Sequence, residues 1–166
     1  MAAWELAQLN IALPVVPLTE PEMAWFVAAL QPVNAAADGA AGFRWRLQTE
    51  DGDATAIRAF GDDRLIVNMS VWDSLDALGD FVYRNPAHVA VLRRRRESFR
   101  RLGQAHQVLW WVPARYRPTV AEAEARLAHL HEHGPTAVAF TFRDPYPAPD
   151  ASERAARADE DWYCRA

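Results

Sequence analysis

The segment RLIVNMSVW, residues 64–72, alternates apolar and polar side chains from Val67 to Val71. Successive side chains of a β-strand point to opposite faces of a sheet. One face of this strand is apolar and is formed by Leu65, Val67, Met69 and Val71. The other face carries Asn68, Ser70 and Trp72. Polar groups in the middle of a strand are poor β-formers unless a partner satisfies them, so this face predicts a ligand or a second protein surface.

Further strands and helices are predicted on both sides of this segment. The strand pattern, a two-residue alternation or a short apolar run bounded by turn residues, recurs at 4–13, 42–48, 107–113 and 136–142. Helical patterns with N-terminal capping residues follow Thr19, Ser74, Asn85 and Thr119. We expect the first helix to pause at Pro32 and the third to end near Leu102.

The order of these elements predicts a ferredoxin-like α+β fold, with one antiparallel sheet and helices on one face. We assign residues 1–149 to this single domain and residues 150–166, which are rich in Ala and charge, to a C-terminal tail. A sheet with one bare face needs a cover. A second copy of the chain would supply it, which predicts a homodimer of the dimeric α/β-barrel type.

Composition excludes several classes of protein. The chain has 166 residues, of which 51% are hydrophobic and 24% charged, with a net charge of −4. This balance is typical of a globular domain and argues against nucleic acid as a partner. One cysteine, Cys164, excludes an intrachain disulfide. No apolar stretch is long enough for a membrane span and the N-terminus lacks a signal-peptide pattern, so we expect a cytoplasmic protein.

Amide and aromatic side chains form the first candidate site. Asn10 on the first strand joins Asn68 and Ser70 as groups that could fix an oxygen-rich aromatic molecule. Aromatic walls would come from three tryptophans, Trp45, Trp72 and Trp110. The alternative is a polar dimer interface in which the amides pair across two sheets. The residues do not decide between a substrate site and such an interface.

The second candidate site lies on the helix after Pro86. One stripe of that helix carries His88, Leu92, Arg95, Phe99 and Leu102 at helical spacing. Facing inward, His88 would serve as a base and Arg95 would hold an anionic or enolate-like group, with Phe81 and Tyr83 as aromatic neighbours. In the alternative interpretation, the histidine is structural and the arginine extends to the solvent edge.

No metal site is predicted. His129 and His133 of HLHEH share a helix face, but no third ligand accompanies them. Histidines near a helix C-terminus also interact favourably with the helix dipole. The basic run at 93–96 spreads its charges around a helix axis and does not indicate a nucleic-acid surface.

Five blocks resemble the bacterial family called domain of unknown function 3291. They are GFRWRLQ (42–48), NMSVW (68–72), FVYRNPAH (81–88), LWWVP (109–113) and GPTAVAFTF (134–142), and the resemblance covers roughly residues 4–147. It implies a relationship to the dimeric α/β-barrel superfamily, which includes small antibiotic-biosynthesis monooxygenases, haem-binding members and stress proteins. The family name implies no activity, so the resemblance bears on fold more than on function.

Two functions are therefore expected from the sequence. The first is a small enzyme of secondary metabolism that acts on an aromatic or polyketide-like molecule without a cofactor, as a monooxygenase or a proton-transfer isomerase or cyclase. In it, His88 would take a proton from a phenol or enol, and the carbanion would react with dioxygen. The second is a non-catalytic binding protein for a hydrophobic small molecule, or for haem with His88 as axial ligand. A ligand-free structural or regulatory dimer is a third class.

Overall fold

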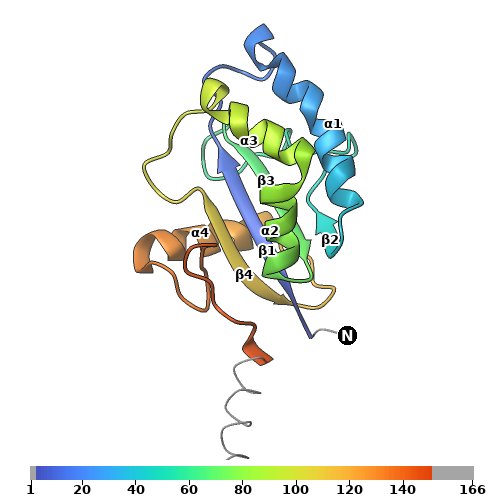
Figure 1. Ribbon diagram of the computed structural model, residues 1–166. Coiled ribbons are helices and arrows are strands. Elements are labelled where there is room, and N and C mark those ends of the chain that lie inside the picture. The colour runs from blue at the N-terminus through green and yellow to red at the C-terminus, as the bar shows by residue number, and fades with distance from the viewer. Residues whose placement is uncertain (1–2, 151–166) are drawn as a thin grey trace, which may run out of the picture.

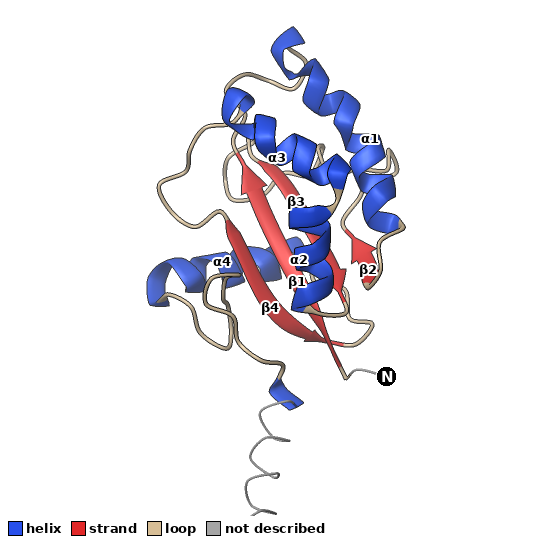
Figure 2. Ribbon diagram, viewed as in Figure 1, coloured by secondary structure: helices blue, strands red, loops and turns tan. Residues whose placement is uncertain are grey.

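The computed structural model describes residues 3–150 and contains one four-stranded antiparallel sheet (Figure 1). Its strands are β1 (Trp4–Ala12), β2 (Phe43–Arg46), β3 (Ile66–Trp72) and β4 (Gln107–Pro113), in the order β2-β3-β1-β4. The helices are the 3₁₀ helix η1 (Pro21–Met23), α1 (Ala24–Asp38), α2 (Leu75–Arg84), α3 (Pro86–Ser98) and α4 (Val120–His133) (Figure 2). This strand order with its crossing helices confirms the predicted ferredoxin-like α+β fold.

The two faces of the sheet are covered by different helices. In Figure 1, α1, α2 and α3 lie in front of the sheet and α4 lies behind it. We call these sides the α1–α3 face and the α4 face. The α4 face carries Ala7, Leu9, Ile11, Val67, Met69, Val71, Val108, Trp110 and Val112, all buried. The α1–α3 face carries Leu6, Gln8, Asn10, Asn68, Ser70, Trp72, Gln107, Leu109 and Trp111.

Helix α4 covers the α4 face within a single chain, whereas helices were predicted on only one face of the sheet. Ala123, Leu127 and Leu130 of α4 pack on it, together with Phe60 and Leu65 of the connection between β2 and β3. The premise of an uncovered face, from which the homodimer was predicted, is therefore wrong. Sequence periodicity identified α4 as a helix but not the face on which it docks. The homodimer itself stays a prediction.

Strand β2 contains an irregularity that the sequence pattern missed. Phe43 pairs with Trp72 while Trp45 pairs with Val71, so the register shifts by one residue between them. Because Trp72 and Val71 point to opposite faces, so do Phe43 and Trp45. A strict two-residue alternation over 42–48 predicts that Phe43, Trp45 and Leu47 share one face, and this is wrong for Phe43, which packs on the α1–α3 face.

Helix boundaries follow the predicted caps in three of four cases. Ser74 accepts from the Ala77 N–H at 3.1 Å, Asn85 from the Ala87 N–H at 3.1 Å, and Thr119 from the Glu122 N–H at 3.1 Å. The first helix differs: η1 starts after Glu20, which provides no side-chain cap.

Helix α1 also continues through Pro32 without the expected pause. Pro32 and residue 28, whose carbonyl the proline leaves without an N–H partner, are both exposed, so water can replace the missing bond.

The segment 136–142 forms no strand. It contributes one antiparallel bridge, in which Leu109 and Phe140 exchange two N–H···O bonds of 2.9 Å at the outer edge of β4. The Phe140 side chain is fully buried on the α1–α3 face. Helix α3 ends at Ser98 rather than near Leu102, because Phe99 is extended and bridges to Pro14. Within residues 3–150, no helix has the length and apolarity needed to cross a membrane.

Candidate functional site

A hydrogen-bonded polar row crosses the α1–α3 face between β1 and β3. Gln8 Nε2 donates to Asn68 Oδ1 at 2.8 Å and to Ser70 Oγ at 3.0 Å. The Trp72 indole N–H donates to the same Ser70 oxygen at 2.8 Å. Gln8 and Ser70 are only 5% and 6% exposed, whereas Asn68 is exposed. The row therefore runs from the buried centre of the sheet to solvent.

The pairing of the strands widens this row at its open end. Asn10 lies directly opposite Asn68 on one side and Gln107 on the other. Three amide side chains thus stand side by side across β3, β1 and β4. Asn10 and Gln107 are partly exposed, and neither makes a side-chain hydrogen bond within the described part of the chain. Their donors and acceptors are available to a ligand.

Buried Ser70 also has hydrogen-bonding capacity left over. A hydroxyl has two acceptor lone pairs and one donor. Gln8 and Trp72 occupy both lone pairs, and the Ser70 hydroxyl donates to no atom of residues 3–150. The Asn68 amide N–H₂ is likewise unused there. The row can therefore donate hydrogen bonds to an oxygen atom of a bound molecule.

Aromatic rings connect the polar row to His88. The Trp72 ring stacks on Phe81 of α2 with centroids 5.2 Å apart, and Phe81 contacts the His88 imidazole at 5.1 Å. Phe43 meets Trp72 edge-on at 5.3 Å. The structure thus brings together three of the predicted site residues, Trp72, Phe81 and His88. The Phe81 ring lies between those of Trp72 and His88, so His88 does not contact the polar row.

His88 sits in the first turn of α3 in a defined tautomer. Its Nδ1 lies 2.8 Å from the Val82 carbonyl oxygen. A carbonyl only accepts, so the neutral ring carries its proton on Nδ1 and presents a lone pair at Nε2. Burial lowers the pKa of His88 below 6.5, and the bond to Val82 opposes this shift. A neutral imidazole with a free Nε2 has the state that a general base requires.

Arg95 lies on the same stripe of α3 as His88 but near its other end. Seven residues of α-helix rise about 10 Å, so the two side chains do not meet at one atom. Arg95 is exposed and forms no ion pair with residues 3–150. Burial lowers the pKa of His106, and the positive charge of Arg95 lowers it further, so Arg95 lies in the neighbourhood of the His106 imidazole.

Three predicted site residues lie elsewhere. Trp45 and Trp110 pack on the α4 face, where the Trp110 indole donates to Glu122 Oε1 at 2.9 Å. They do not line a common pocket with Trp72, and that prediction is wrong because the strand pairing sets them on the other side of the sheet. Tyr83 is 58% exposed and contacts Phe142, facing away from the polar row.

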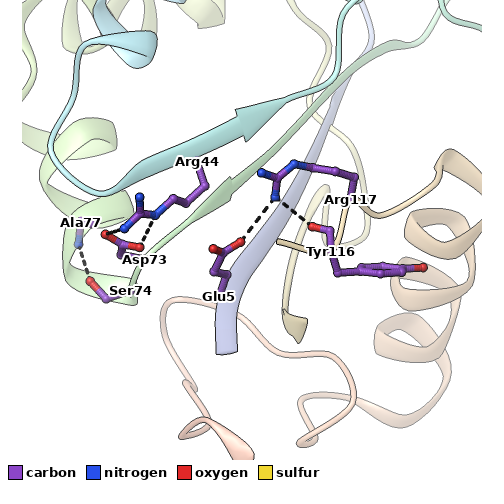
Figure 3. Close-up of polar contacts among 7 residues, drawn as sticks. All are labelled: Glu5, Arg44, Asp73, Ser74, Ala77, Tyr116 and Arg117. Carbon is purple, nitrogen blue, oxygen red and sulfur yellow. Dashed lines mark hydrogen bonds and ion pairs between the residues drawn. The ribbon is translucent and has the colours of Figure 1, made fainter. Parts of the chain in front are cut away.

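The polar side of the 42–48 segment is satisfied within the chain. Two guanidinium nitrogens of Arg44 donate to the two carboxylate oxygens of Asp73, next to the Ser74 cap of α2 (Figure 3). Arg46 pairs with Asp38 at 2.8 Å. At the same end of the molecule, Arg117 lies 3.4 Å from Glu5 (Figure 3). These ion pairs satisfy Arg44, Arg46 and Arg117 within the chain.

Two of the other histidines, both on α4, have structural partners. His129 Nε2 lies 2.9 Å from Thr136 Oγ1, and His131 Nε2 lies 2.6 Å from the Ala105 carbonyl. No group of metal-ligating side chains occurs in residues 3–150. A groove of about 560 Å³ borders Phe81 and Asn85, and another of about 300 Å³ lies between α1 and α3.

The sequence reasoning missed two residues at the open end of the row, His106 and Gln107. The alternation of 107–113 places Gln107 on the face of Leu109 and Trp111, but only the pairing with Asn10 reveals its amide neighbours. His106 precedes the strand, and its carbonyl accepts from the Ile11 N–H at 2.9 Å. No local pattern marks it.

Several solved structures resemble this chain at low identity. SnoaB, a cofactor-independent oxygenase from Streptomyces nogalater, is 17% identical with a TM-score of 0.44, covering 68% of this chain and 95% of that one. A protein proposed to be an antibiotic biosynthesis monooxygenase, from Nitrosomonas europaea, is 9% identical with a TM-score of 0.44, covering 72% and 97%. A dabb family protein with a ferredoxin-like fold, from Mesorhizobium loti, is 14% identical with a TM-score of 0.41, covering 70% and 98%.

Comparison at the level of sequence gives the family. No curated protein matches the chain. The model of a domain of unknown function, DUF3291, matches residues 5–157, which is most of the sequence and includes every block on which the resemblance was based. The chain belongs to the DUF3291 family.

Proposed function

We propose that the α1–α3 face binds an aromatic or polyketide-like small molecule and that the protein catalyses a cofactor-independent, proton-transfer-initiated oxygenation of it. The observation that carries this proposal is the row formed by Gln8, Asn68 and Ser70. It places a buried hydroxyl with an unused proton inside an otherwise apolar layer. Burying polar groups costs stability unless they are satisfied, and an apolar replacement would pack as well. A ligand oxygen would use the donors that the fold leaves over.

His88 is the base in this proposal. Its neutral ring with a free Nε2 would remove a proton from an enol or from an acidic carbon of the substrate. Because Phe81 lies between His88 and the polar row, the negative charge would spread through the conjugated rings of the substrate to a distant oxygen, to which Ser70 and Asn68 would donate hydrogen bonds. Phe81, which borders the groove beside Asn85, would supply flat apolar surface for the rings.

The chemistry balances without a bound cofactor. The substrate carbanion gives one electron to dioxygen, and the two radicals combine into a peroxide on carbon. Loss of the second hydrogen from that carbon, with cleavage of the O–O bond, forms a carbonyl and releases water. One oxygen atom ends in the product and the other in water, and the proton held by His88 leaves with that water. If dioxygen does not react, the same proton transfer gives an isomerisation or cyclisation.

Haem fits this environment poorly. His88 Nε2 is a suitable iron ligand in its chemistry, but the Phe81 ring contacts the imidazole and neither groove is lined by His88. We derive no step through haem.

The test uses anthrone, an enolisable tricyclic ketone, as the probe substrate. Dioxygen consumption and product formation are measured for the wild type, for His88→Ala and for His88→Gln, whose amide preserves a donor for Val82. Loss of a general base lowers rates by about 10²-fold or more, so both variants should lose turnover. His133→Ala is the matched control, because His133 is exposed at the end of α4, and it should keep full activity.

The outcomes separate the candidate functions. Full activity in His88→Gln contradicts the proposed role of His88. Saturable binding of anthrone without turnover in the wild type favours a binding protein. Absorbance near the haem Soret region in purified protein would favour the haem alternative.

A further inference from the structure

We infer that the open end of the polar row is an anion subsite, and that the molecule bound on the α1–α3 face carries a carboxylate recognised by Arg95 and by the amides of Asn68 and Gln107. This inference rests on the proposed function for the identity of the rest of the ligand. It adds Gln107 and a chemical requirement on the substrate.

The first part of the argument is the arrangement of donors. Asn10, Asn68 and Gln107 lie side by side at one level of three neighbouring strands. Within residues 3–150, no partner accepts from the N–H₂ group of Asn68, and the side-chain amides of Asn10 and Gln107 make no hydrogen bond. Several N–H donors at one edge of a sheet match the oxygen atoms of a carboxylate, which accepts up to about four hydrogen bonds.

The second part is the charge. Arg95 lies one helical turn before Phe99, whose N–H donates to the Arg95 carbonyl and which bridges to Pro14 just beyond β1, so the end of α3 carries Arg95 to this end of the sheet. A planar guanidinium matches a carboxylate in a two-point pair. Arg44 and Arg46 at the β2 edge are paired with aspartates, whereas Arg95 has no acidic partner in the described chain.

The third part is distance. Arg95 and His88 are separated by about 10 Å along α3. This is the spacing of their backbone positions, and the flexible arginine side chain can shorten it. An aromatic acid of two or more fused rings is long enough to contact both side chains.

The experiment compares two probes that differ only in charge, 3-hydroxy-2-naphthoate and its methyl ester. Binding is measured by isothermal titration at low salt, without turnover. We expect the acid to bind about tenfold more tightly than the ester to the wild type, and this preference to fall as salt rises. Arg95→Gln and Gln107→Leu should each remove most of the preference by weakening only the acid. Arg93→Gln is the matched control, because it removes the same charge from an exposed position two residues away, and it should keep the preference.

Equal binding of acid and ester to the wild type overturns the inference, as does the absence of saturable acid binding up to about 1 mM. An equal loss of preference in Arg93→Gln and Arg95→Gln also overturns it, because it shows a general basic surface. Failure of the proposed function looks different: no dioxygen is consumed, while the preference for the acid and its dependence on Arg95 persist.

Discussion

The two faces of the sheet are built from the same strands but have different chemistry. On the α4 face, every strand residue between Ala7 and Ile11 that points that way is apolar and buried, and α4 covers it. On the α1–α3 face, Gln8 and Asn10 alternate with those residues and join a polar row that opens to solvent. An apolar face is sufficient for stability. Both faces carry a buried apolar cluster, and the proposed function rests on the polar row that only the α1–α3 face adds.

Neighbouring residues of β1 give the largest expected contrast. Leu9→Ala deletes a fully buried side chain on the α4 face, so it should lower the free energy of unfolding by about 2–5 kcal/mol. Asn10→Ala, one residue along and on the other face, removes a partly exposed side chain without hydrogen bonds and should change stability by about 0.5 kcal/mol or less. Denaturant unfolding measures both. Similar losses in the two variants would show that the faces do not differ in this way.

A glycine fixes how closely α2 approaches the edge of the sheet on the α1–α3 face. Gly42 has φ +80°, and a Cβ there would lie 2.6 Å from the Ala77 Cβ. Gly42→Ala should therefore destabilise by about 2 kcal/mol, from backbone strain and from the clash. Gly52→Ala controls for strain alone, because Gly52 has φ +86° and no atom within 4 Å of such a Cβ. Equal thermal shifts for the two variants would argue against tight packing of α2.

The polar row is expected to contribute little to stability. Gln8→Leu removes two hydrogen bonds but leaves Ser70 paired with Trp72 and Asn68 open to water. We predict a change of about 1 kcal/mol or less in unfolding free energy, together with weaker binding of the hydroxynaphthoate probe. Chemical denaturation and titration of the same sample measure the two effects. A loss as large as that of Leu9→Ala would make the row a structural element.

Much of the fold follows from local pattern. The strand patterns and the caps Ser74, Asn85 and Thr119 were sufficient to predict the four strands, the ferredoxin-like fold class and most helices. The docking of α4, the bulge in β2 and the single bridge at Phe140 depend on contacts between distant segments, which periodicity does not encode.

The candidate site shows the same limit. The prediction placed Asn68, Ser70 and Trp72 on one face from their spacing alone, and the structure agrees. It failed for Trp45 and Trp110, because the face on which a strand residue lies depends on register with its neighbours. Gln107 and His106 needed the pairing of β1 with β4 to be recognised.

The smallest expected effect concerns pH. The pKa of His88 in the folded protein is below the ordinary value of 6.5, so between these two values the unfolded chain binds a proton that the folded chain does not. His88 therefore contributes stability above pH 6.5, and this contribution is lost as pH falls through the folded-state pKa. Unfolding free energies measured from pH 7.5 down to about 5 should decline less in His88→Gln than in the wild type. His106 shifts in the same direction, so part of the decline remains. An unchanged slope would mean that His88 titrates normally.

The most direct test compares two indole N–H groups in one protein. Trp72 lies on the α1–α3 face, and its indole N–H donates to Ser70. Trp110 lies on the α4 face, and its indole N–H donates to Glu122. Their ¹H–¹⁵N signals, assigned with Trp→Phe variants, are followed while 3-hydroxy-2-naphthoate is added. The account predicts that the Trp72 signal moves with saturation and that the Trp110 signal stays in place. Movement of Trp110 with Trp72 unchanged would contradict it, because the ligand would then occupy the α4 face.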